Sequence, residues 1–359
     1  MHVLILCSSN AVELIVAIMA LIQGKVIIVQ TSLIGSILSN LLLVMGMCFF
    51  CGGLQRQEQY FNTTVAQTAA SLLALAVASI IVPTVFDLNT GKSSDINIPA
   101  LSRGTSVITL VVYGAYLFFQ LKTHHTVFAA ESQKVPAKPF KAAGLKDGAI
   151  RQGMVNPAAL MGVHGLTSDP EQLRHMLLNS HPRADDEEDE EEPQLHFTVA
   201  IATLTISTVI IALCAEFMVD SIDAITKDGG LSEEFVGLIL LPIVGNAAEH
   251  ATAVTVAIKD KMDLAIGVAV GSSMQVALFL IPLLVIIGWG MGIDAMNLSF
   301  DIFQVAVLFV SVLLVNYLIA DGKSHWLEGL LLICLYFIIA VCSWCKSPPR
   351  PPSQKWVLG

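Results

Sequence analysis

The sequence has little charge. Only 13% of its 359 residues are Asp, Glu, Lys or Arg, 55% are hydrophobic, and the mean hydropathy is +0.72. Because a soluble globular domain carries about 25% charged residues, this composition excludes an ordinary soluble protein. The net charge of -10 gives little reason to expect nucleic acid as a partner. We therefore expect a membrane protein whose main partner is the lipid bilayer.

Motifs of common enzymes are missing as well. The chain contains no HExxH metal motif, no P-loop and no GxSxG nucleophile elbow, so we expect no enzyme activity and no cofactor. Its seven cysteines lack the spacing of a disulfide-rich secreted domain. Two CxxC pairs, Cys48 with Cys51 and Cys342 with Cys345, fit either helix packing or a zinc or redox site.

Long apolar runs dominate what is present. A bilayer core of about 30 Å needs about 20 apolar residues in a helix, and lipid cannot satisfy an unpaired backbone. The sequence therefore predicts an all-α polytopic fold with about nine transmembrane helices. They are expected near residues 3–22, 29–53, 64–86, 103–121, 196–220, 233–258, 263–290, 299–320 and 325–345.

One polar segment divides these helices into four and five. We expect a first transmembrane repeat at 1–121, a linker at 122–195, a second repeat at 196–345 and a tail at 346–359. The linker ends in an acidic run. Such a run is usually a solvated, flexible part of a linker, and the alternative is a cation-attracting or regulatory segment. The run consists of Asp185, Asp186, Glu187, Glu188, Asp189, Glu190, Glu191 and Glu192.

Basic residues predict the orientation. Twelve Lys and Arg residues lie in the connections on the linker's side and seven on the other side. Positive charge marks the cytoplasmic side of membrane proteins, although the rule weakens for long connections. We therefore expect the linker to be cytosolic.

The strongest signal is an internal repeat that aligns without a gap when Glu13 is placed over Glu249. Identities at polar residues and glycine in this register are hard to produce by apolar composition alone. The two glutamate helices are the first and sixth of nine, so the copies cross the membrane in opposite directions, as in the inverted repeats of secondary transporters. In the alignment, SNAVE at 9–13 matches GNAAE at 245–249, Lys25 matches Lys261, and Gly35-Ser36 matches Gly271-Ser272.

Two carboxylates lie inside these repeats. An acidic side chain at the centre of a membrane helix costs about 2.5 to 3.5 kcal/mol on insertion scales and marks a functional site. Carboxylate, amide and hydroxyl oxygens suit a hard cation such as calcium, which we expect to bind at Glu13 and Glu249. Further candidates are Asn10, Asn246, Ser36, Ser39, Asn40, Ser272 and Gln275. Interhelical packing is the alternative for the serines, and His250 is either a proton relay or a structural hydrogen-bond donor.

These segments resemble the paired repeats of cation/proton exchangers, most closely the fungal and plant vacuolar calcium/proton exchangers. The resemblance rests on SNAVELI at 9–15, GSILSN at 35–40 and GNAAEH at 245–250. It implies two five-helix halves joined by an acidic cytosolic segment, with Glu13 and Glu249 binding ion and proton in turn. Ser9 stands where the family has Gly, and two N-terminal helices of the family pattern are absent, so we expect an N-terminally truncated first repeat.

The sequence thus predicts a secondary active antiporter that exchanges cytosolic calcium for lumenal protons across a vacuolar membrane. Protons and calcium would compete for the same carboxylate oxygens. The alternatives are a sodium-coupled calcium exchanger and a non-transporting homologue that modulates a full-length exchanger. A homo-oligomer is compatible with each of these functions.

Overall fold

The computed structural model describes residues 2–90, 98–129, 132–135, 197–227 and 231–346. By its internal contacts the chain forms one unit from Met1–Pro139 with Ser207–Gly359, and a second from Phe140–Ile206. Only residues 197–206 of the second unit are described, and every contact below lies within the first. The acidic run at 185–192 lies outside the described residues.

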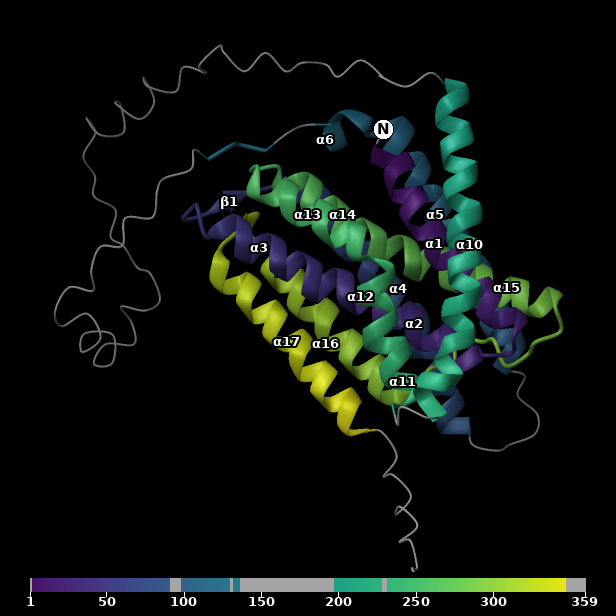
Figure 1. Ribbon diagram of the computed structural model, residues 1–359. Helices are drawn as coiled ribbons and strands as arrows, with labels where there is room; N and C mark the ends of the chain where they lie inside the picture. Colours follow the sequence, from purple (N-terminus) through teal and green to yellow (C-terminus); the bar gives the residue numbers. More distant parts are fainter. Residues whose placement is uncertain (1, 91–97, 130–131, 136–196, 228–230, 347–359) are drawn as a thin grey trace, which may run out of the picture. The chain divides into compact units, whose positions relative to one another are not determined.

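The first half of the chain is a series of apolar helices (Figure 1). Its helix α2 continues through the π-helical segment η1 into α3, so that one long span runs from Val26 to Gly53. The elements are α1 (His2–Ile22), α2 (Val26–Leu38), η1 (Ser39–Val44), α3 (Met45–Gly53), β1 (Gln59–Tyr60), α4 (Thr63–Thr90), α5 (Ile98–Phe118), η2 (Phe119–Thr123) and α6 (His125–Ala129).

The second half repeats this pattern after an additional long helix, α10. Three helix starts in this half carry side-chain caps. The Ser232 hydroxyl accepts from Phe235 N–H, the Asp301 carboxylate accepts from the N–H groups of Phe303 and Gln304, and His325 forms a capping box with Glu328. The elements are α10 (Phe197–Lys227), α11 (Glu233–Phe235), η3 (Val236–Leu240), α12 (Leu241–Gly245), α13 (Ala247–Ile258), α14 (Met262–Gln275), η4 (Val276–Leu280), α15 (Ile281–Gly290), α16 (Ile302–Leu318), β2 (Lys323–Ser324) and α17 (Trp326–Cys345).

The predicted all-α class is confirmed. Within the described part of the chain, the strands are limited to β1 and β2, which pair antiparallel. Five helices there are long and apolar enough to cross a membrane, and a sixth span results if the bent pair 233–245 and 247–258 counts as one. Two shorter apolar helices, Asn10–Ile22 and Ile302–Leu318, accompany them. The count of nine stays a prediction.

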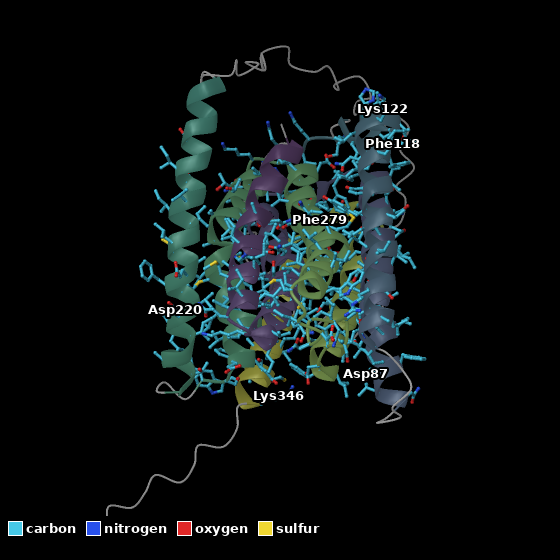
Figure 2. The ribbon with its side chains drawn as sticks, turned by 90° about the vertical axis from the view of Figure 1, so that its right-hand side faces the viewer. Asp87, Phe118, Lys122, Asp220, Phe279 and Lys346 are labelled. Atoms are coloured by element: carbon cyan, nitrogen blue, oxygen red, sulfur yellow. The ribbon has the colours of Figure 1, made fainter. Side chains whose placement is uncertain are left out.

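Charged side chains lie at the ends of these helices. Lys122 is near one end, whereas Asp87 and Lys346 are near the other (Figure 2). Between the ends, α3 packs along α17, α2 packs against η3, and α14 packs against α4 and α13. The largest buried cluster includes side chains from both repeats, such as Leu38 and Leu278, so the repeats share one core.

Backbone geometry follows the repeat register that aligns Glu13 with Glu249. In this register, Ile22 at the end of α1 is equivalent to Ile258 at the end of α13, and Val26 at the start of α2 is equivalent to Met262 at the start of α14. The π-helical segments η1 and η4 also end at equivalent residues, Val44 and Leu280. Because π-helical turns are rare, their recurrence at equivalent positions supports a duplicated structural unit.

The two glutamate helices differ in one respect. We expected 233–258 as one stretch, but the helix breaks at Asn246, and the pieces on either side are bent by 57°. Pro242 lacks an N–H and is the second residue of α12, and Gly245 directly precedes the break. The first repeat has Leu6 and Ser9 at the equivalent positions, and α1 continues through Asn10.

Close approach of α2 to the broken helix depends on Gly35. A Cβ atom at Gly35 would lie 2.3 Å from the carbonyl oxygen of Leu238 and 2.7 Å from Cγ of Pro242. We expect Gly35→Ala to force the two helices apart and to destabilise the fold by about 1 to 3 kcal/mol. Thermal unfolding of the purified protein in detergent measures this loss.

Gly267→Ala is the matched control, because a Cβ atom there has no neighbour within 4 Å. Since alanine favours a helix more than glycine does, this variant should be neutral or slightly stabilised. Equal thermal midpoints for the two variants would contradict the close packing at Gly35.

Candidate functional site

Glu13 lies at the centre of a small polar cluster. Its carboxylate is held by donors from two other elements: the hydroxyl of Ser36 on α2, and the amide of Asn246, whose Nδ2 is 2.7 Å from Oε1. The same amide lies 3.1 Å from Ser36 Oγ. Glu13, Ser36 and Asn246 thus form a closed triangle across the two repeats.

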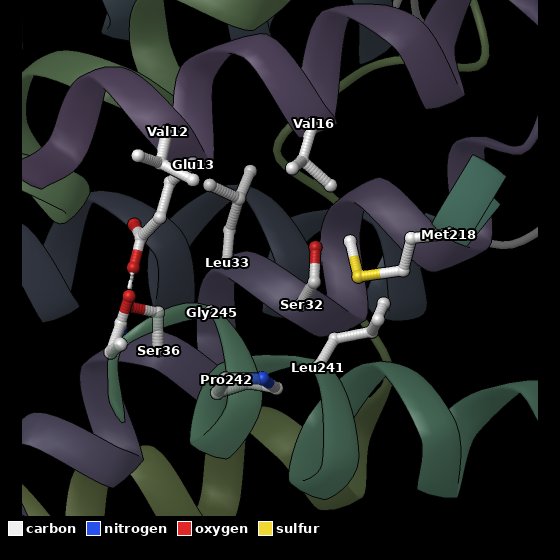
Figure 3. A pocket seen from close by; sticks show the side chains of 11 residues that line it. Val12, Glu13, Val16, Ser32, Leu33, Ser36, Met218, Leu241, Pro242 and Gly245 are labelled. Atoms are coloured by element: carbon white, nitrogen blue, oxygen red, sulfur yellow. Dashed lines mark hydrogen bonds between the residues drawn. The ribbon is translucent and has the colours of Figure 1, made fainter. Parts of the chain in front are cut away.

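This triangle borders a cavity of about 40 Å³, which has room for a water molecule or a bare ion. Figure 3 shows Glu13 pointing from α1 toward Ser36, with Met218 of α10 and Leu241 of α12 on the far side. One Glu13 oxygen, Oε2, is buried and has no hydrogen-bond partner among the described residues. The lining residues are Val12, Glu13, Val16, Ser32, Leu33, Ser36, Met218, Leu241, Pro242, Gly245 and Asn246.

Glu249 occupies the first turn of α13, immediately after the break. The positive end of the helix dipole favours a carboxylate at this position. Its Oε2 is buried without a hydrogen-bond partner in the described part of the chain. Glu13 and Glu249 thus each have a buried carboxylate oxygen that lacks a partner among the described residues.

A second set of polar side chains forms hydrogen bonds between the two repeats. Asn10 Nδ2 donates to Gln275 Oε1 at 2.8 Å, and Ser272 donates to Asn10 Oδ1 at 3.0 Å. Asn40 Nδ2 reaches Ser272 Oγ at 3.3 Å. Each of these bonds joins a residue of one repeat to a residue of the other.

His250 also links the repeats. Its Nε2 lies 3.2 Å from the hydroxyl oxygen of Ser39, and both side chains are buried. The structural alternative considered for His250 was a bond to a backbone carbonyl, whereas the bond in the structure goes to Ser39. Ser273 differs from these residues, because its hydroxyl donates to Ala269 O on its own helix at 2.8 Å.

Apart from Glu249, which is not among the residues that line the cavity, the sequence-predicted residues thus separate into three groups in space. Glu13, Ser36 and Asn246 gather at the cavity, Asn10, Asn40, Ser272 and Gln275 form the second set, and Ser39 pairs with His250. In a continuous helix, the i, i+3 spacing of Asn246 and Glu249 would place the amide and the carboxylate on one face. Instead, the break directs the Asn246 amide to Glu13 of the other repeat.

Sequence reasoning missed several apolar wall residues of the cavity. Pro242 was not among the predicted site residues, yet it lies in the first turn of α12 and lines the cavity. Met218 approaches from α10, and an apolar residue in an apolar helix carries no pattern that would have singled it out.

The cross-repeat hydrogen bonds predict energetic coupling. We expect Asn10→Ala and Gln275→Ala to lower stability by amounts that are not additive, with a coupling of about 0.5 to 3 kcal/mol. A double-mutant cycle on thermal unfolding in detergent measures it. The control cycle combines Asn10→Ala with Thr252→Ala, because Thr252 is exposed and its hydroxyl bonds a carbonyl of its own helix. The stability losses of this control pair should be additive. A coupling of zero between Asn10 and Gln275 would contradict the hydrogen bond between them.

Comparisons with known proteins agree with this architecture. A model of the sodium/calcium exchanger protein family matches residues 3–122 and 199–345. A vacuolar calcium ion transporter of Schizosaccharomyces pombe is 43% identical, over 92% of this chain and 68% of that protein. Another from Cryptococcus neoformans var. grubii is 41% identical, over 93% of this chain and 62% of that protein.

A solved structure is also similar. The Ca²⁺/H⁺ antiporter YfkE superimposes with a TM-score of 0.69 at 30% identity, covering 96% of this chain and 85% of that chain. These relatives are transporters and antiporters rather than enzymes, and the predicted resemblance to cation/proton exchangers is confirmed. The chain spans 62% and 68% of the lengths of the two fungal relatives. From these matches and from the shared helical architecture, this chain belongs to the sodium/calcium exchanger family.

Proposed function

We propose that this protein exchanges calcium for protons across the membrane that its helices span, with Glu13 and Glu249 binding either ion. The observation that carries the proposal is the Glu13 carboxylate, which borders a cavity and receives hydrogen bonds from both repeats. The functions of the similar proteins, calcium ion transport and Ca²⁺/H⁺ antiport, agree with it.

Competition between the two ions follows from the chemistry of the cluster. Two carboxylates that share an apolar site repel each other, and either a divalent cation or protons relieve that repulsion. Calcium prefers six to eight oxygen ligands, which carboxylates, hydroxyls and amides supply. A proton on Glu13 or Glu249 removes the charge that attracts calcium, so one ion leaves as the other binds.

Alternating access requires the repeats to move around this cluster. The polar contacts join one repeat to the other, as the bonds of Asn246 and Asn10 do. A rearrangement of the halves therefore changes the ligands available to the ion. We assign the proton relay to His250 with Ser39, because this buried pair lies at the same interface between the repeats.

The proposal includes the direction of calcium transport and the membrane in which the protein resides. The vacuolar residence of the similar fungal transporters and the excess of basic residues on the linker's side favour a cytosolic linker and calcium uptake into an acidic lumen. In this arrangement 1–121 and 196–345 are the two repeats, and the acidic run at 185–192 faces the cytosol, where it attracts cations.

Removal of either carboxylate charge tests the site. We expect Glu249→Gln, and separately Glu13→Gln, to lower calcium uptake at least about 100-fold, because a neutral amide cannot exchange a proton for a cation. Uptake into reconstituted vesicles measures the effect. Glu233→Gln, an exposed acid at the start of α11, is the matched control and should transport normally, whereas full activity in Glu249→Gln would exclude this site.

The driving gradient provides an independent test. Uptake into acid-loaded vesicles should stop when a protonophore collapses the pH gradient, and it should be unchanged by sodium. Uptake that follows a sodium gradient instead would establish the sodium-coupled alternative, which the family description itself suggests. Absence of uptake under both gradients, with correctly folded protein, would favour the non-transporting homologue.

A further inference from the structure

The turns that follow the two glutamate helices share an unusual backbone. Gly24 has φ of 73° and Asp260 has φ of 62°, and the two residues are equivalent in the repeat register. Within the described residues, Asp260 is the one residue other than glycine with positive φ. Aspartate adopts this left-handed region more readily than most residues, but glycine adopts it without a steric penalty. The second repeat therefore keeps a side chain where the first repeat has none.

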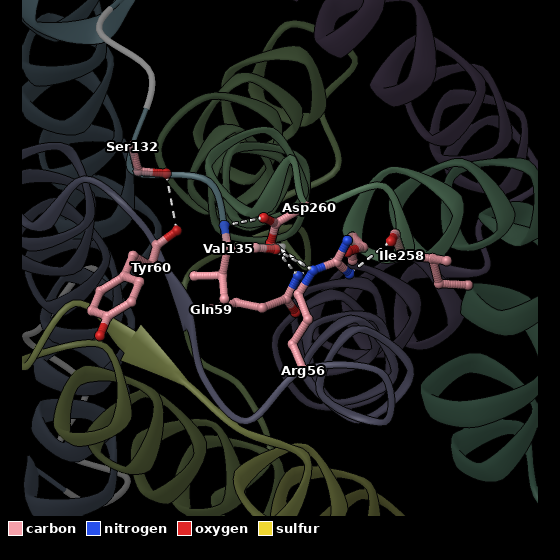
Figure 4. Close-up of polar contacts among 8 residues, drawn as sticks. Arg56, Gln59, Tyr60, Ser132, Val135, Ile258 and Asp260 are labelled. Carbon is pink, nitrogen blue, oxygen red and sulfur yellow. Dashed lines mark hydrogen bonds and ion pairs between the residues drawn. The ribbon is translucent and has the colours of Figure 1, made fainter. Parts of the chain in front are cut away.

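The Asp260 carboxylate uses this position to bind three partners. Gln59 Nε2 lies 2.8 Å from Oδ1, the backbone N–H of Val135 donates to Oδ2 at 2.6 Å, and Arg56 Nε is 3.4 Å from Oδ1 (Figure 4). The side chains of Arg56 and Asp260 are each only 9% exposed, so water screens this ion pair weakly.

Arg56 and Gln59 also cap the end of α13. The guanidinium of Arg56 donates to Ile258 O at 2.9 Å, and the amide of Gln59 donates to Ala257 O at 3.1 Å. The last carbonyls of a helix otherwise lack partners. The end of the helix that carries Glu249 is therefore tied to β1 and to the connection between α3 and β1 in the first repeat.

The beginning of the linker completes the arrangement. Arg56 Nε donates to Val135 O at 2.9 Å, and the Ser132 N–H donates to Asp263 Oδ2 at 2.9 Å. The Ser132 hydroxyl contacts the same Asp263 oxygen and Tyr60 O. Residues 132–135 are thus held through their backbone by two aspartates that flank the start of α14.

The first repeat holds its equivalent turn by different contacts, because Gln23 Nε2 donates to Asp220 Oδ1 at 2.8 Å and Lys25 Nζ donates to Val219 O at 2.9 Å, both on α10. In the repeat register, Asp260 corresponds to Gly24, Arg56 to Gly292 and Gln59 to Ala295. None of the three counterparts has a side chain that could form an ion pair or donate to a helix end. Inverted repeats exchange conformations during alternating access, so a buried ion pair at one of the two turns, with different contacts at the other, favours one of the two conformations.

We propose that Asp260, Arg56, Gln59 and linker residues 132–135 form a one-sided latch that holds the turn between α13 and α14 and thereby brakes exchange. The braking role rests on the proposed transport function. Helix α13 carries Glu249, and α14 carries Ser272 and Gln275, so any movement of this hairpin against β1 must break the latch contacts. Contacts made in one conformation shift the population toward it by their differential free energy.

Three variants of the latch separate its parts. Asp260→Gly reproduces the backbone of the first repeat without the carboxylate, and Asp260→Asn retains one acceptor oxygen. Val135→Pro removes the N–H that donates to Asp260, at the cost of a fixed φ at 135 and a restricted Lys134. It keeps the Asp260 carboxylate and Arg56, and so still tests the latch if loss of the carboxylate prevents folding. Gln133→Ala is the control, because it changes an exposed neighbour on the same segment.

Hydrogen exchange of the backbone amides at 257–265, in detergent, tests the latch without any requirement for transport. We expect exchange about tenfold faster in Asp260→Gly and in Val135→Pro, which corresponds to about 1.4 kcal/mol. Asp260→Asn should be intermediate, and Gln133→Ala should match the wild type. Unchanged exchange in both Asp260→Gly and Val135→Pro would overturn the latch, whether or not the protein transports calcium.

Initial rates of calcium uptake into vesicles test the brake. Per folded protein, Asp260→Gly and Val135→Pro should transport several-fold faster than the wild type at saturating calcium, with Asp260→Asn again intermediate. A purely structural role would lower the uptake rate or leave it unchanged, and either result would overturn the brake. Absence of uptake by the wild type would instead count against the proposed transport function. Hydrogen exchange would still show whether the latch contacts hold the turn between α13 and α14.

Discussion

A carboxylate buried among apolar helices has to obtain its hydrogen-bond donors from neighbouring helices, because lipid offers none. Glu13 obtains one from Ser36 and one from Asn246. These donors reach it because α2 approaches the broken helix closely at Gly35 and because the break at Asn246 turns the amide toward α1. The cavity, the helix break and the close packing are therefore parts of one arrangement around a single side chain.

Much of this arrangement could be predicted from the sequence. Apolar runs of membrane length predict the helices, and the repeat register predicts which polar residues belong together. Glu13, Ser36 and Asn246 were all singled out on this basis. The structure extends the repeat to features that have no sequence signature of their own, such as the π-helical segments η1 and η4.

What could not be predicted depends on geometry between helices. The spacing of Asn246 and Glu249 assumes a continuous helix, and the break invalidates that assumption for the second repeat alone. Pro242 and Gly245 are the local cause, but proline and glycine are tolerated in many membrane helices without a sharp bend. The wall residue Met218 comes from α10, a helix whose position against α1 no local pattern specifies.

The left-handed turn shared by Gly24 and Asp260 also bears on how the two halves of the protein diverged. A backbone with positive φ accepts few residue types other than glycine, chiefly Asn and Asp. Evolution at this position therefore had a narrow choice, and in one copy it led to an acid. A duplicated turn could in this way acquire a charge, and with it a role specific to one side of the membrane, while its main-chain path stayed the same.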